Sequence, residues 1–165
     1  MPETLTVSVT KDIPASSDVI FAILADPTRH PEIDGSGMLR RATSSATING
    51  IGDTFTMQMH NEEMGDYEMI NHVVEYQAGR SIAWEPALLH AGREEDKEGE
   101  GVRSGHRWSF TLEPINSSRT VVTESYDCSS APPWLQNAVK GGARWRASME
   151  ASLEKIHRLC STAVV

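Results

Sequence analysis

The sequence lacks the features of several large protein classes. Its two cysteines, Cys128 and Cys160, form neither a CxxC pair nor a metal-binding spacing with histidine. We therefore expect two free thiols in a reducing compartment, and neither a disulfide framework nor a metal site. No apolar run approaches the roughly 18 to 20 residues that cross a bilayer, so we expect no stable membrane insertion. The first ten residues lack the basic and apolar segments of a secretory signal, which favours a cytoplasmic location.

Positive charge is also scarce. Fifteen Lys and Arg residues stand against 23 Asp and Glu residues, a formal net charge of −8 at pH 7. Because nucleic-acid phosphates are bound by basic surfaces, we expect no nucleic-acid partner. The chain is 39% hydrophobic and 23% charged, which is typical of a globular protein. Its 165 residues suit one domain, residues 1–165.

The hydrophobic pattern predicts a strand, two short helices, a run of strands and a long helix. Alternation indicates the first strand at residues 5–10, and the short helices fall at residues 19–25 and 28–33. From residue 38 to residue 128 the pattern predicts about six antiparallel strands joined by turns. Apolar or small residues then recur every three or four positions from Pro132 to Cys160, which predicts one long helix. A sheet with such a helix on one face is an α+β arrangement.

Two segments have alternative interpretations. Gly141 and Gly142 interrupt the predicted long helix, which indicates close packing or a slight kink, or else a flexible gate beside a cavity. Residues 90–105 are highly charged, so we expect a solvated hairpin loop, with a mobile lid as the alternative.

Period-two alternation in the strands predicts which side chains face the long helix. Methionine and aromatic residues are prominent in this set, and such side chains line adaptable pockets as readily as they fill a core. With three residues of the C-terminal segment, they form the candidate ligand-binding set: Phe55, Met57, Met59, Ile70, His72, Val74, Tyr76, Ile82, Trp84, Trp108, Phe110, Glu124, Tyr126, Trp134, Val139 and Trp145.

Three of these polar side chains are candidate catalytic residues, namely His72, Tyr76 and Glu124. A lone inward histidine is either a hydrogen-bonded structural residue or a base. An unpaired buried carboxylate is costly, so Glu124 pairs with Arg107 or Arg144, orients a ligand, or acts as an acid or base. A register shift of one residue would turn Glu124 to solvent.

Short phrases spread over nearly the whole chain carry a family resemblance. They are IPAS at 13–16, VIFAILADP at 19–27, RHPEIDGSG at 29–37, GIGDTF at 50–55, VVEY at 73–76, IAW at 82–84 and VTES at 122–125. They resemble the START/Bet v 1-like (SRPBCC) superfamily, in particular its bacterial polyketide cyclase/dehydrase and lipid-transport branch. The resemblance implies a helix-grip fold, in which a curved seven-stranded antiparallel sheet surrounds a long C-terminal helix, with two short helices after the first strand. It also implies a cavity for a hydrophobic molecule, no metal or nucleotide cofactor, and a structural role for His30, Glu32 and Asp34.

The expected function is the binding of a small hydrophobic molecule, lipid- or polyketide-like, between the sheet and the C-terminal helix. The first alternative is a cofactor-independent aromatase/cyclase or dehydratase that acts on a polyketide. The second is a protein-interaction module such as a chaperone cofactor. The expected partner is the hydrophobic ligand, with a homodimer left open.

Overall fold

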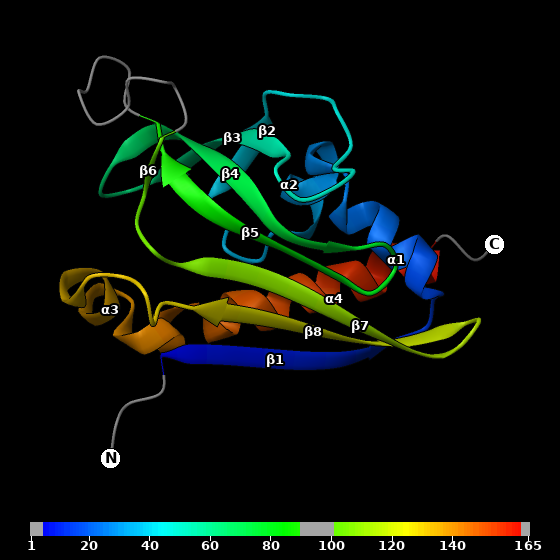
Figure 1. Ribbon diagram of the computed structural model, residues 1–165. Helices are drawn as coiled ribbons and strands as arrows, with labels where there is room; N and C mark the ends of the chain where they lie inside the picture. Colours follow the sequence, from blue (N-terminus) through cyan, green and yellow to red (C-terminus); the bar gives the residue numbers. More distant parts are fainter. Residues whose placement is uncertain (1–4, 90–100, 163–165) are drawn as a thin grey trace.

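The computed structural model describes residues 5–89 and 101–162 (Figure 1). Its strands are β1 (Thr6–Ile13), β2 (Leu39–Ala42), β3 (Thr54–Asn61), β4 (Gly65–Gln77), β5 (Ser81–Leu88), β6 (Val102–Arg103), β7 (Arg107–Asn116) and β8 (Arg119–Asp127). Its helices are α1 (Ser17–Leu24), α2 (His30–Ile33), α3 (Pro133–Ala138) and α4 (Arg146–Thr162), with 3-10 turns η1 (Pro27–Arg29) and η3 (Lys140–Trp145).

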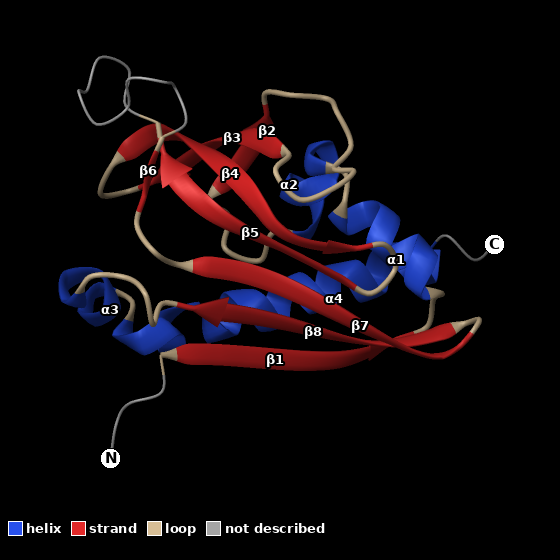
Figure 2. Ribbon diagram, viewed as in Figure 1, coloured by secondary structure: helices blue, strands red, loops and turns tan. Residues whose placement is uncertain are grey.

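The strands form one antiparallel sheet in the order β1-β8-β7-β5-β4-β3-β2, with β6 paired to β5. Figure 2 shows α4 behind the strands β1, β8 and β7, on one side of the curved sheet. Helix α4 contacts both β1 and β8. The predicted α+β helix-grip fold is confirmed.

The two short helices after β1 begin at side chains that accept hydrogen bonds. The Ser16 hydroxyl accepts from the Val19 N–H at the start of α1, and the Asp26 carboxylate accepts from the Thr28 N–H at η1. Such caps satisfy N–H groups that lack a partner within the helix. Both predicted helices are therefore confirmed, and α2 begins at His30.

The prediction of one continuous C-terminal helix is wrong in its first half. Lys140, Gly141 and Gly142 have φ angles of 53°, 65° and 102°, and these positive values end a right-handed helix. A Cβ atom on Gly142 would lie 3.0 Å from the Tyr126 ring and 3.1 Å from Val7. The glycine pair thus marks both a close approach and a break, which separates α3 from α4.

Helix α4 keeps the predicted apolar stripe. Its buried side chains are Met149, Leu153, Ile156 and Cys160, at steps of three or four residues. These residues belong to the same core as the inward side chains of β1, β7 and β8. Within the described ranges, no helix combines the length and apolar character required to span a bilayer.

The charged loop predicted at residues 90–105 falls mostly on residues 90–100, which lie outside the described residues, and so does the lid alternative. Val102 and Arg103 form β6 beside the end of β5.

Candidate functional site

The concave face of the sheet, meaning the face toward α4, carries rows of large side chains across its central strands. Residues directly opposite each other in an antiparallel pair share a face. Two rows across β5, β7 and β8 consist of Trp84, Trp108 and Tyr126, and of Ile82, Phe110 and Glu124. All six face α4, as the alternation predicts.

Aromatic rings gather at one end of this face. The Trp108 ring centroid lies 4.6 Å from that of Tyr126 and 6.1 Å from that of Trp145. Trp84 lies 6.0 Å from Phe110 in a tilted contact. These separations are within the range of favourable aromatic pairs. The rings form an apolar wall from β5 to the end of η3.

The predicted inward orientation of Ile70 and His72 is wrong. Phe55 lies opposite Asn71 in the β3–β4 pair, and Phe55 is buried in the core. Asn71 therefore faces α4, as does Met69, which lies opposite the buried Met57. The alternate residues Ile70 and His72 face the other side of the sheet.

A β-bulge in β4 is the physical reason for this difference. Val73 lies opposite Trp84, but the next pair joins Glu75 to Ala83. Val74 is thus an extra residue without an opposing partner, and the alternation changes phase at this point. Val74, predicted to face inward, lies in the bulge itself.

Beyond the bulge, Tyr76 lies opposite Ile82 and faces inward as predicted. Its ring packs edge-on against Phe21 of α1, with centroids 5.5 Å apart. Before the bulge, sequence reasoning missed the inward residues Tyr67, Met69, Asn71 and Val73. Along the chain, no glycine or proline lies within residues 70–78 to indicate the bulge.

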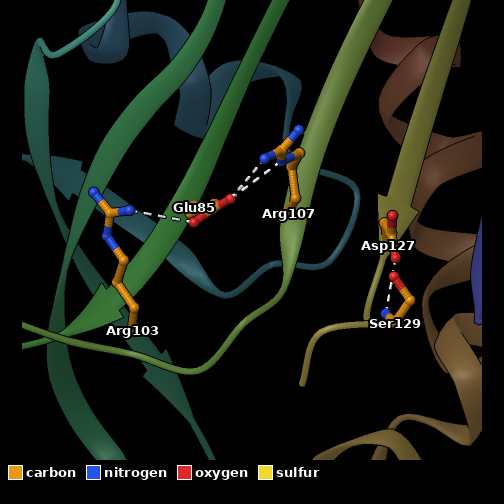
Figure 3. Close-up of polar contacts among 5 residues, drawn as sticks. All are labelled: Glu85, Arg103, Arg107, Asp127 and Ser129. Atoms are coloured by element: carbon orange, nitrogen blue, oxygen red, sulfur yellow. Dashed lines mark hydrogen bonds and ion pairs between the residues drawn. The ribbon is translucent and has the colours of Figure 1, made fainter.

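The outer face carries a charged cluster opposite His72. His72 lies across from Glu85, whose carboxylate accepts hydrogen bonds from Arg103 at 3.3 Å and from Arg107 at 2.9 Å (Figure 3). Nearby, the Asp127 carboxylate accepts from the Ser129 N–H at 2.8 Å. His72 therefore takes no part in the concave face.

Glu124 is the buried carboxyl group of the concave face. It is 4% exposed, and it has neither a hydrogen bond nor an ion pair within residues 5–89 and 101–162. Arg107 binds Glu85, and Arg144 lies over the Trp145 ring. Of the three alternatives for Glu124, pairing with Arg107 or Arg144 is therefore wrong.

Burial raises the pKa of Glu124 to about 8, and the negative charge of Asp34 adds to this increase. Removal from water disfavours the ionised form of a carboxyl group. At neutral pH this side chain is predominantly a neutral acid, which has one O–H donor.

His106 and Tyr126 form a second polar pair beside the aromatic wall. The His106 Nδ1 atom lies 2.9 Å from the Tyr126 hydroxyl. Burial lowers the pKa of His106 to about 4 and raises the pKa of Tyr126. The Trp145 N–H lies near the same hydroxyl without a hydrogen bond of good geometry. Both members of the pair are uncharged at neutral pH.

His30 has the structural role expected for it. Its Nε2 atom lies 2.8 Å from the Leu24 carbonyl oxygen, so this nitrogen carries the proton. The ring stacks on Trp84 with centroids 5.2 Å apart, and burial lowers the pKa of His30. Across the part of the chain that the structure describes, no three His, Cys, Asp or Glu side chains gather to hold a metal ion.

The remaining candidate residues divide by position. Met59 faces inward opposite Tyr67 and is half-buried, whereas Val139 is buried in the core. Trp134 is 67% exposed on α3, and its place in the ligand site stays a prediction. Its exposure follows from the break at Gly141 and Gly142, because the register of α4 does not continue into α3.

An open groove of about 500 Å³ lies between α4 and β1, the strand at one edge of the sheet. Its lining includes Lys11 and Glu154, which form a 3.0 Å ion pair, and Arg146. Such a polar groove does not suit an apolar molecule.

Comparisons with known proteins agree with this architecture. A family model described as polyketide cyclase/dehydrase and lipid transport matches residues 4–160. The uncharacterized protein Rv0088 of Mycobacterium tuberculosis is 27% identical over 160 residues, which cover 91% of this chain. The chain spans 62% of that relative's length.

Solved structures share the fold. Protein Ms6760 of Mycobacterium smegmatis has a TM-score of 0.68 at 18% identity and covers 97% of this chain and 93% of its own. The ZhuI aromatase/cyclase of Streptomyces sp. R1128 has a TM-score of 0.66 at 13% identity, covering 97% and 95% of the two chains. The match to the family model extends over almost every described element, and the chain therefore belongs to the polyketide cyclase/dehydrase and lipid transport family.

Proposed function

We propose that this protein binds a small, largely hydrophobic molecule, lipid- or polyketide-like, between the concave face and α4. The supporting observation is that several large side chains face α4 and yet are only half-buried, among them Met59, Met69, Trp84 and Trp108. Native cores are close-packed, so side chains in a filled interior would be fully buried. Their remaining accessibility therefore supports a ligand space on the concave side.

The chemistry of this face suits such a ligand. Methionine side chains adapt to irregular shapes, and indole rings offer large apolar surfaces. Small-molecule sites are generally apolar with a few polar groups that fix orientation. Here Glu124 would be such a group.

The test is native mass spectrometry of the purified protein, followed by organic extraction of the molecules that it carries. We expect a reproducible small hydrophobic molecule at one per chain, and thermal stabilisation when it is added back. A protein that is purified empty, and whose melting temperature no hydrophobic compound of a broad library raises, would contradict the proposal.

A cyclase or dehydratase is the second candidate. A neutral acid that faces an apolar site can donate a hydrogen bond to a carbonyl oxygen and stabilise an enolate, and Glu124 fits this role. Of the other candidate catalytic residues, His72 is on the outer face and Tyr76 packs against Phe21. Incubation with a poly-β-ketone analogue would test this function. We would expect wild-type protein to accelerate cyclisation, and an unchanged rate would exclude it.

The other expectations remain predictions. The interaction module would require a contiguous exposed apolar patch, whereas the exposed large apolar side chains belong to separate segments: Val19, Ile51, Met64, Ile115 and Trp134. Light scattering would test the homodimer, and cell fractionation would test the cytoplasmic location.

A further inference from the structure

We infer that Glu124 selects the ligand by donating a hydrogen bond to an uncharged oxygen acceptor, such as the carbonyl group of a ketone or quinone. This inference rests on the proposed function, because it assigns the polar contact of the same site. It names a ligand class that the apolar walls alone do not specify.

The position of Glu124 supports a contact with a ligand. Its opposing residues are Phe110 on β7 and Val9 on β1, so the carboxyl group lies among apolar side chains on the face toward α4. The fully enclosed side-chain polar atoms without a partner, among the described residues, are Ser44 Oγ and Trp145 Nε1. Glu124 is not among them, so its carboxyl oxygens keep a small accessible surface.

The carboxyl group of Glu124 also lacks a hydrogen-bond partner among the described residues. Buried polar groups in proteins are nearly always hydrogen-bonded, and an unsatisfied one is unfavourable. Glu124 is buried without a hydrogen bond or ion pair from the described residues. Within the described ranges no protein group satisfies its O–H, whereas an acceptor atom on a bound molecule would do so.

Charge defines the ligand class further. Asp34 adds negative charge, and its carboxylate is held by the N–H groups of Ser36 and Leu39. Lys155 donates to the Asp34 backbone carbonyl at 2.7 Å, so this ammonium group already has an acceptor. A ligand carboxylate or phosphate would meet two acidic side chains here. We therefore expect a neutral ligand and not a fatty acid or a phospholipid headgroup.

A matched pair of probes tests the assignment. Fluorene and 9-fluorenone are rigid aromatic molecules of nearly equal shape, and they differ by the carbonyl group. We expect the wild-type protein to bind 9-fluorenone about three- to tenfold more tightly than fluorene, the range of one net hydrogen bond. Quenching of tryptophan fluorescence would measure both affinities.

Two substitutions separate a donor from a charge. Glu124→Gln keeps an N–H donor without an ionisable group, so it should retain the preference for 9-fluorenone. Glu124→Met has a similar length and no donor, so it should bind both probes equally. In the infrared spectrum, the carbonyl stretch of bound 9-fluorenone should lie at lower frequency in the wild type and in Glu124→Gln than in Glu124→Met.

The outcomes distinguish this inference from the proposed function. Equal binding of both probes to the wild type would overturn the role of Glu124 and leave hydrophobic binding intact. The role of Glu124 would also be overturned if Glu124→Gln lost the preference for 9-fluorenone over fluorene, or if Glu124→Met kept that preference. Absence of binding by either probe would count against the proposed function and thus against both. Should Glu124→Met fail to fold, the wild-type preference and the infrared shift still decide the question.

Discussion

A Cβ atom added to Gly142 would lie 3.0 Å from Cδ1 of Tyr126. The break between α3 and α4 is therefore in direct contact with the aromatic wall that forms one end of the concave face. Tyr126 is itself completely buried and packs against Trp108 and Trp145. The backbone conformation of residues 140–142 and the shape of the site depend on each other.

Substitution of Gly142 should lower stability. Gly142→Ala places a side chain at φ 102° and against two buried neighbours, so we expect the free energy of unfolding to fall by about 1 to 3 kcal/mol. Gly50→Ala is the control, because a Cβ atom there meets nothing within 4 Å. Urea denaturation would compare them, and equal midpoints for the two variants would contradict the packing described here.

Stability should depend on pH through Glu124. Its pKa is about 8 in the folded protein and about 4.5 when unfolded. The unfolded chain therefore releases its proton first, so the contribution of this group to stability is complete below pH 4.5 and is lost as pH rises to about 8. Glu124→Gln should remove this loss and be more stable than wild type by a few kcal/mol at pH 8. Asp34 is present in both proteins, so the difference in their pH dependence reports the ionisation of Glu124 alone.

Thermal unfolding at several pH values would measure the effect. The advantage of Glu124→Gln should grow between about pH 4.5 and pH 8 and then level off. A constant difference over that range would show that the carboxyl group titrates as if it were exposed.

His106 should remain neutral far below the pH at which histidine usually gains a proton. Its pKa is lowered from 6.5 to about 4 by burial, so protonation favours the unfolded chain between these values. Stability should therefore fall as pH is lowered through this range and be unaffected above it. An NMR titration of the ring nitrogens would check the assignment. Protonation of His106 near pH 6.5 would contradict it.

The neighbours Met69 and Ile70 should differ in their effects on ligand binding. Met69 faces α4, whereas Ile70 faces the outer side, where a Cβ atom on Gly101 would lie 2.8 Å from its Cγ2 atom. Met69→Ala should weaken binding of 9-fluorenone about fivefold or more through lost apolar contact. Ile70→Ala should leave affinity unchanged, even if stability falls. A loss of affinity in Ile70→Ala but not in Met69→Ala would show that Ile70, and not Met69, faces α4.

The fold could be predicted from the sequence because its strands and helices have clear periodic patterns. In β7 and β8, regular alternation places Trp108, Phe110, Glu124 and Tyr126 on the correct face. These strands keep their phase through the residues that form the site. The apolar stripe of α4 was likewise visible as a repeat of three or four residues.

The site could be predicted only in part. In β4, one extra residue at Val74 reverses the phase, and the partner strand that reveals the bulge is not visible in a single stretch of sequence. The C-terminal segment posed a similar problem, since its apolar repeat continues across Gly141 and Gly142 while the backbone does not. The missing partner of Glu124 depends on the directions of Arg107 and Arg144, which follow from three-dimensional packing.

The methionine methyl groups provide the most direct test of the central claim, that a hydrophobic molecule binds on the concave face. With methyl-labelled methionine, NMR would follow Met59 and Met69, which face α4, and Met64, which is 51% exposed in the turn between β3 and β4. On addition of 9-fluorenone, we expect the Met59 and Met69 signals to shift and to show contacts with the probe, while Met64 stays unchanged. Shifts confined to Met64, or no shift at saturating probe, would contradict binding on this face.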